Sequence, residues 1–133
     1  MDMDLKDQAR VEAVWRRVLG STATKYGSLA RREARIGAIC RQLHRLGANR
    51  ALLERLYRQS ARRKQALEAM AKLEGEAPSV SQSLSAPADM ATLIRELGLA
   101  AGDYDPGHPI YGAMFAGFRR DCAQAQNALL RLM

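Results

Sequence analysis

The chain has 133 residues, of which 47% are hydrophobic and 26% charged, and its net charge is +7. This length gives one domain that can bury a core without disulfides or metal. The acidic start Met1–Asp4 is unlike a secretory signal, and no stretch approaches the ~20 apolar residues that span a bilayer. We therefore expect a cytoplasmic protein that does not associate with membranes.

A first helix is predicted over residues 4–19, where apolar residues recur at the steps of one helix face. Gly20 and Ser21 end it. We expect Trp15 to pack in the core rather than to hold a ligand. The apolar stripe consists of Val11, Val14, Trp15, Val18 and Leu19.

Two longer helices are predicted next, over residues 28–46 and 50–73. Gly47 is a favourable C-terminal stop for the first, and Asn49 is a favourable N-cap for the second. Because the link is so short, the two helices should be antiparallel neighbours. The residues expected to face inward on the first of them are Leu29, Ile36, Ile39, Cys40, Leu43 and Leu46.

The stretch of residues 75–87 is rich in Pro and Ser, so we expect a flexible crossover that could run the length of a bundle. A fourth helix is predicted over residues 88–101, and the breaker of residues 103–107 follows it. The last helix opens near Pro109 and continues to the C-terminus. Its expected inward stripe is Tyr111, Met114, Phe115, Phe118, Cys122, Ala125, Leu129 and Leu132.

These elements predict an all-α fold, an antiparallel four-helix bundle with an additional N-terminal helix. The whole chain, residues 1–133, forms one domain in this prediction. Its two hairpins cover residues 28–74 and 88–133, and the crossover joins them.

The sequence also repeats itself between the two hairpins. Arg32-Glu33 matches Arg95-Glu96 at an offset of 63 residues, which gives one inward Glu per hairpin. In the later helix of each hairpin, matching residues lie 62 positions apart. The first set is Leu52, Leu53, Leu56, Ser60, Leu67 and Met70, and the second is Met114, Phe115, Phe118, Cys122, Leu129 and Leu132.

With this repeat, residues 28–133 resemble the ferritin-like, rubrerythrin-type family, and the run Asp-Pro-Gly-His-Pro-Ile-Tyr-Gly-Ala-Met-Phe at 105–115 adds to the resemblance. Members that bind two irons use one Glu from each of two helices and Glu-x-x-His from each of the other two. The six corresponding positions here are Glu33, Ala61, Lys64, Glu96, Ala123 and Gln126. Because only two of these six residues, Glu33 and Glu96, carry a carboxylate, the resemblance implies a relative that binds no metal and no cofactor.

Lys64 falls on an otherwise apolar stripe, which leaves two interpretations open. Its stem could pack while the ammonium reaches solvent. Alternatively, the ammonium could replace the lost metal charge and pair with Glu33, Glu96 or both, since two buried carboxylates need compensation. In that case Gln126 could add hydrogen bonds to the same carboxylates.

Positive charge is concentrated between residues 31 and 64, where eleven Lys and Arg stand against two Glu. Such a cluster could attract nucleic acid or another polyanion, or it could be a solvated helix face. We expect no aromatic side chain of this region to stack on bases. The candidate polyanion-binding residues are Arg31, Arg35, Arg41, Arg45, Arg55, Arg58 and Arg62.

Cys40 and Cys122 form no Cys-x-x-Cys pair, so we expect two buried free thiols rather than a disulfide. His44 and His108 are expected to be surface residues rather than metal ligands. No nucleophile–base arrangement and no phosphate-binding glycine loop is present in the sequence.

The sequence therefore predicts a non-enzymatic binding or scaffold protein, which partners another protein or itself. Two alternatives remain open at this stage. One is a degenerate metal-binding protein that uses Glu33, Glu96 and Asp121. The other is a nucleic-acid-binding protein that uses the basic surface without sequence specificity.

Overall fold

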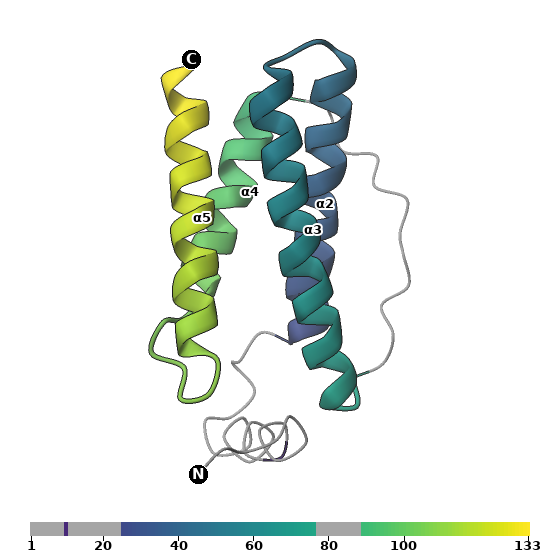
Figure 1. Ribbon diagram of the computed structural model, residues 1–133, viewed down its shortest axis with the longest axis vertical. Coiled ribbons are helices and arrows are strands. Elements are labelled where there is room, and N and C mark those ends of the chain that lie inside the picture. Colours follow the sequence, from purple (N-terminus) through teal and green to yellow (C-terminus); the bar gives the residue numbers. More distant parts are fainter. Residues whose placement is uncertain (1–9, 11–24, 77–88) are drawn as a thin grey trace.

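The computed structural model describes residue 10 and residues 25–76 and 89–133. Within these ranges the chain is helical, without strands, and four helices pack as a bundle (Figure 1). The helices are α2 (Tyr26–Arg45), α3 (Arg50–Leu73), α4 (Met90–Asp103) and α5 (Gly112–Arg131). The prediction of an all-α bundle is confirmed. The predicted first helix and most of the predicted crossover lie outside the described residues.

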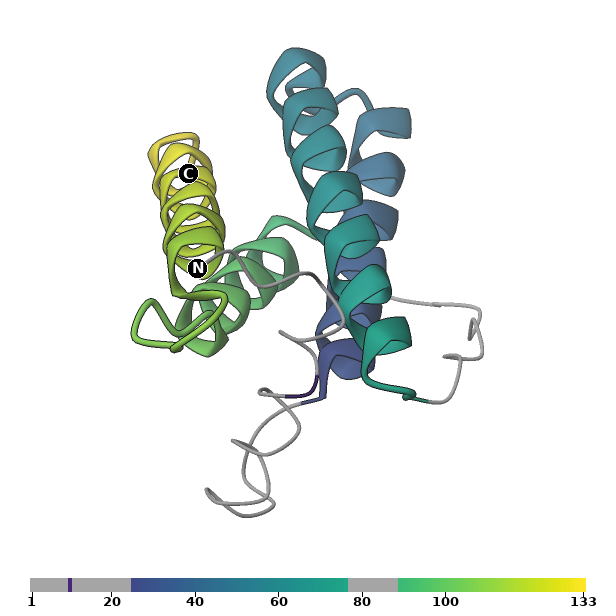
Figure 2. The ribbon, with the colours of Figure 1, turned by 60° about the horizontal axis from the view of Figure 1, so that its bottom comes forward.

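The four helices form two antiparallel hairpins, α2–α3 and α4–α5 (Figure 1). Helix α3 ends at the lower end of the bundle in this view, and α4 begins near the upper end. The hairpins meet chiefly where α2 packs against α4, whereas α3 and α5 contact each other much less (Figure 2). The seam between α2 and α4 is therefore the place where the two halves of the repeat come together.

The first hairpin begins its turn as the sequence predicts. Gly47 has a φ of +85°, and the N–H of Ala48 donates to the carbonyl of Leu43, which is the bond of a glycine-terminated helix. The side chain of Asn49 then accepts a hydrogen bond from the N–H of Leu52 at 3.2 Å. Both predictions, the stop at Gly47 and the cap at Asn49, are confirmed.

The second hairpin departs from its predicted boundaries by a few residues. Asp89 caps α4 through a 2.7 Å hydrogen bond from the N–H of Thr92, so the helix starts at Met90. Helix α5 starts at Gly112 rather than near Pro109, because residues 105–111 form turns. A Cβ on Gly112 would lie 2.6 Å from the carbonyl oxygen of Pro106, so this close approach requires glycine.

Most of the predicted inward residues are buried, and most repeat-related pairs agree in burial. Ser60 and Cys122, for example, are 1% and 0% exposed. Two predictions are wrong: Leu46 is 72% exposed and Leu132 is 52% exposed. Both residues are the C-caps of their helices and follow the last helical turn that packs in the core.

Candidate functional site

The centre of the bundle holds a fully buried carboxylate, that of Glu33 on α2. Its Oε1 accepts hydrogen bonds from Arg63 Nε at 2.8 Å and from the Tyr104 hydroxyl at 2.5 Å. The Ser60 hydroxyl lies 2.8 Å from Oε2 and 2.6 Å from the carbonyl oxygen of Glu33. Both carboxylate oxygens are thus satisfied by groups from α3 and from the end of α4, as a buried charge requires.

Arg63 supplies the positive charge of this network and is itself only 3% exposed. Burial alone would lower the pKa of its guanidinium, but the hydrogen bond and the negative charge of Glu33 raise that pKa above its ordinary value. Arg63 therefore keeps its positive charge beside the Glu33 carboxylate.

The other titratable groups near this centre are held in their protonated forms. Burial, together with the charge of Glu33, raises the pKa of the Tyr104 hydroxyl far above its usual range. Burial raises the pKa of the Cys40 and Cys122 thiols to about 12. Both cysteines are free and fully buried, so the prediction of two buried thiols is confirmed. Neither thiol is activated as a nucleophile.

Of the two interpretations of Lys64, the structure has the one in which the ammonium reaches the surface, and Lys64 does not pair with Glu33 or Glu96. The Lys64 side chain is 43% exposed, and its ammonium pairs with Glu68 at 3.2 Å on the surface of α3. The inward positions of α3 are Ser60 and Arg63, one residue earlier than Ala61 and Lys64. One residue turns an α-helix by about 100°, so this shift moves a side chain from the core to the rim.

The same shift applies to α5, where Cys122 and Ala125 are buried while Ala123 and Gln126 are half-buried. Gln126 does not reach either carboxylate, contrary to the prediction. Its side-chain amide donates to the carbonyl of Ile94 at 3.0 Å.

Glu96, the repeat partner of Glu33, is 7% exposed and finds its cation on the other hairpin. Arg35 of α2 places Nε 3.2 Å from Oε1 of Glu96, and Arg95 lies 3.8 Å from the same oxygen. The position that corresponds to Arg63 in α5 is Ala125, which carries no charge. Each inward glutamate therefore has its own arginine.

The residues of the metal-binding alternative do not come together. Over residues 25–76 and 89–133, no three His, Cys, Asp or Glu side chains are grouped so that they could hold an ion, and this includes Glu33, Glu96 and Asp121. With Arg63 in contact with Glu33, a bound cation would also face direct electrostatic repulsion.

His108 is a structural residue, not a surface one as predicted. Its Nδ1 accepts hydrogen bonds from the N–H groups of Ile110 and Tyr111 at 3.1 and 2.9 Å, and Nε2 lies 3.5 Å from the Tyr26 hydroxyl. The ring also packs edge-on against Phe115. His108 thereby holds the turn before α5.

His44 is half-buried and lines a pocket between α2 and α3.

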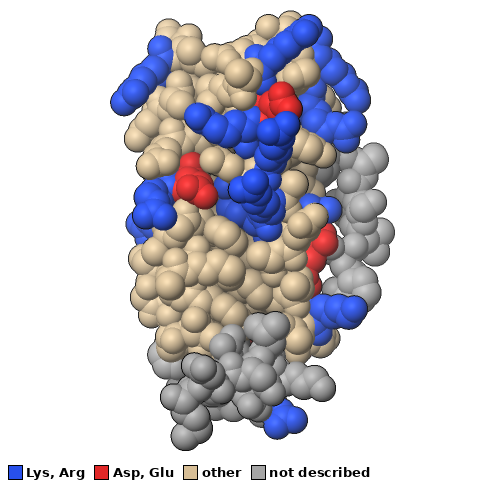
Figure 3. Space-filling model, viewed as in Figure 1, with Lys and Arg blue, Asp and Glu red and all other residues tan. Residues whose placement is uncertain are grey.

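The basic surface gathers at the end of the α2–α3 hairpin. Figure 3 shows Lys and Arg over the upper half of the face where α3 begins, and few charges below. Of the predicted residues, Arg35 and Arg58 are engaged by Glu96 and Glu54, and Arg31 donates to Ser28. The arginines of this hairpin without an ion pair to a described residue are Arg31, Arg41, Arg45, Arg50, Arg55 and Arg62.

Tyr57 is an exposed aromatic ring in the middle of this surface, contrary to the expectation that none would be available. Its side chain is 38% exposed, and the guanidinium of Arg41 lies 5.9 Å from the ring centroid. Two pockets adjoin it, with volumes of about 360 and 230 Å3, and Arg41 and Tyr57 line both.

No protein family model, no curated protein and no solved structure matches the chain. Among the described residues, no helix is both long enough and apolar enough to cross a membrane.

Proposed function

We propose that this chain is a non-enzymatic binding or scaffold protein, a ferritin-like relative in which an arginine has taken the place of the metal. Its partners would be another protein or a second copy of the chain, in the cytoplasm. The observation that carries the proposal is the Glu33–Arg63 ion pair. The charge of this carboxylate is already compensated by a guanidinium and two hydroxyl groups, so it needs no metal ion for its burial.

The relation to the ferritin-like family rests on the positions of these residues. Ser60 and Arg63 lie at i and i+3 on α3, face the single Glu of α2, and contact it directly. In di-iron members, Glu-x-x-His has this spacing and the same inward direction. Two antiparallel hairpins, with α3 ending at one end of the bundle and α4 beginning near the other, also suit that family (Figure 1).

Iron loading tests the proposal. Protein purified natively, and again after anaerobic loading with ferrous iron and desalting, should contain no iron above the buffer blank. Stoichiometric iron in the wild type would overturn the metal-free proposal. Loss of that iron in Glu96→Gln and Asp121→Asn variants would then support the metal-binding alternative.

A second candidate function, electrostatic binding of nucleic acid, is favoured by the unpaired arginines around Tyr57. The ring adds the stacking group that such surfaces use. Binding of a fluorescent single-stranded RNA should then weaken steeply between about 50 and about 200 mM salt. A flat salt response, or no binding at the lower salt, would remove this candidate.

A further inference from the structure

We propose that the larger pocket between α2 and α3 binds a small molecule that carries a phosphate monoester. This proposal goes beyond the proposed function, in which the partners are another protein or a second copy of the chain. The pocket lies where α2 ends and α3 begins, and its volume of about 360 Å3 falls in the range of small-molecule sites.

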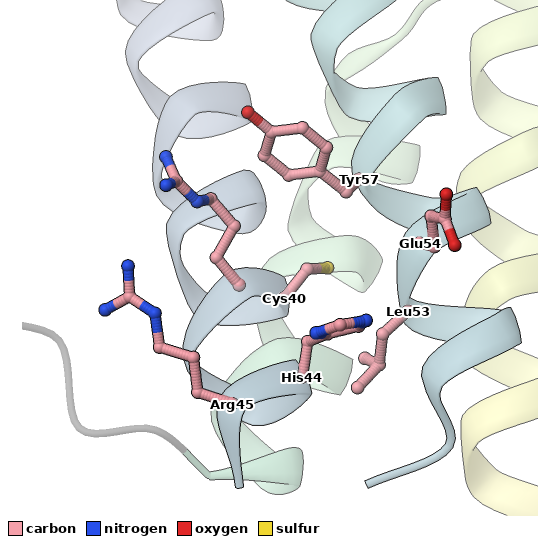
Figure 4. A pocket seen from close by; sticks show the side chains of 7 residues that line it. Cys40, His44, Arg45, Leu53, Glu54 and Tyr57 are labelled. Carbon is pink, nitrogen blue, oxygen red and sulfur yellow. The ribbon is translucent and has the colours of Figure 1, made fainter. Parts of the chain in front are cut away.

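The α2 wall of the pocket is basic. Arg41, His44 and Arg45 line this wall from neighbouring positions of the helix, at i, i+3 and i+4. The His44 ring lies on the α3 side, whereas the Arg45 side chain extends away from α3, so its guanidinium stands at the rim of the pocket and would have to turn inward to meet a ligand (Figure 4). Neither arginine has an ion pair with a described residue, and arginine stays charged at every physiological pH. Two uncompensated positive charges therefore stand at one wall.

The α3 wall and the floor are different in character. Leu53 and Cys40 are buried at the floor, and the Tyr57 hydroxyl points from α3 toward α2 (Figure 4). Glu54 also borders the pocket, but its carboxylate points away from α2 and is engaged by Arg58 at 2.5 Å. The pocket thus combines a cationic wall with an apolar floor and an aromatic side.

These side chains indicate which class of ligand the pocket would bind. A phosphate monoester carries a charge of about −1.5 to −2 near neutral pH, which matches two guanidinium groups. Arginine presents donors in a fork that fits phosphate oxygens, and the imidazole of His44 can add a donor. The contact between Arg41 and the Tyr57 ring holds one guanidinium in place before the ligand arrives. The remainder of the ligand would lie against Leu53 and Tyr57.

The test uses AMP as the probe, with adenosine and inorganic phosphate as its two parts. In two-dimensional amide NMR titrations of the full chain, AMP should saturate and shift residues at the end of α2 and the start of α3. Adenosine and phosphate should each bind more weakly. Absence of saturation by AMP, or shifts confined to other helices, would overturn the proposal.

The matched variants are Arg41→Gln/Arg45→Gln at the pocket and Arg119→Gln/Arg120→Gln on α5. All four side chains are exposed and each variant removes two charges, so both proteins should fold. We expect the pocket variant to lose about tenfold or more in affinity for AMP, while the α5 variant keeps it. Equal losses in both would show a net-charge effect and overturn the site. These titrations involve no metal, so their failure is distinguishable from a failure of the iron test.

Discussion

Arg63 on α3 and Glu33 on α2 form an ion pair of 2.8 Å whose two side chains are 3% and 0% exposed. Desolvating both charges is costly, and the cost is offset only where every polar atom finds a partner. Glu33 meets that condition through Tyr104 and Ser60, whereas Nη1 of Arg63 is buried without a hydrogen bond. The pair therefore fixes how α2, α3 and the end of α4 fit together more than it adds net stability.

Arg63→Met should destabilise the protein severely. The substitution leaves the Glu33 carboxylate buried without a cation, which typically costs about 3–5 kcal/mol of the free energy of unfolding. Lys64→Met is the matched control, because its ammonium is at the surface and its pair with Glu68 contributes at most about 0.5 kcal/mol. Urea unfolding of both variants measures the difference. Equal effects of the two substitutions would contradict the role of Arg63 as the internal charge.

Neutralising both partners should recover part of that loss. Glu33→Gln keeps an oxygen that can accept from Tyr104, so in Glu33→Gln/Arg63→Met no buried charge is left unpaired. We expect the double variant to be more stable than Arg63→Met. A double-mutant cycle should give a coupling energy of about 1–3 kcal/mol. Additive losses, with no coupling between the two sites, would contradict the importance of the pair.

The helical architecture could be predicted because local signals and periodicity agree. Gly47 and Asn49 set the turn of the first hairpin through their own backbone and side-chain chemistry, which needs no tertiary information. The start of α5 differs from the prediction because it depends on how residues 105–112 fold on one another, which helix periodicity does not report. Gly112 packs against the backbone of Pro106, and His108 caps the N–H groups before it.

The inward charge on α3 could not be assigned from one helix alone. Seen down the axis of α3, Arg63 lies about 60° to one side of Ser60 and Lys64 about 40° to the other side. Helix periodicity alone therefore allows either residue to face inward. The rotation of α3 against α2 decides between them. The repeat could have decided between them. Arg63 corresponds to Ala125 at the offset of 62 residues, and Ala125 lies on the predicted inward stripe of the last helix, so Arg63 should face inward as well.

The role of Tyr104 had no signal in the sequence. It lies in a predicted breaker, yet it is the C-cap of α4 and 1% exposed. Its hydroxyl crosses from the second hairpin to the carboxylate of the first, while Arg35 crosses in the opposite direction to Glu96. Such reciprocal contacts arise only when two hairpins dock.

Stability should fall as the pH rises above about 9. The folded chain keeps protons on Cys40 and Cys122 up to a pKa of about 12, whereas the unfolded chain releases them near the ordinary value of 9.0. Since these pKa values are raised by folding, their contribution is complete below pH 9 and is lost between pH 9 and 12. Two thiols give a slope of at most about 3 kcal/mol per pH unit within that window, and Tyr104 adds to it at higher pH.

The control for this prediction removes the thiols. Under reducing conditions, Cys40→Ala/Cys122→Ala should show a shallower fall in the urea midpoint between pH 8 and 11 than the wild type. The same slope in both proteins would contradict a role for the buried thiols. In native wild-type protein, both thiols should also resist a thiol-specific reagent until the chain unfolds.

Two glycines near the second hairpin's turn should respond to alanine in opposite ways. A Cβ at Gly112 would meet the carbonyl oxygen of Pro106 at 2.6 Å, and a backbone atom cannot rotate aside. We expect Gly112→Ala to cost about 1–3 kcal/mol, the usual range for overpacking. Gly102, in the last turn of α4, has no atom within 4 Å of the added carbon, so Gly102→Ala should gain up to about 1 kcal/mol in helix propensity.

Thermal unfolding of the two variants tests both expectations, a loss of stability for Gly112→Ala and a gain for Gly102→Ala, and in each variant the change is the addition of one methyl group. Gly112→Ala should also loosen the turn that His108 holds through the N–H of Tyr111, so the His108 ring resonances should broaden or shift only in that variant. If Gly112→Ala were as stable as Gly102→Ala, the Pro106 carbonyl would not contact α5 closely. The start of α5 would then be set by His108 alone, and His108→Ala would be expected to shift it.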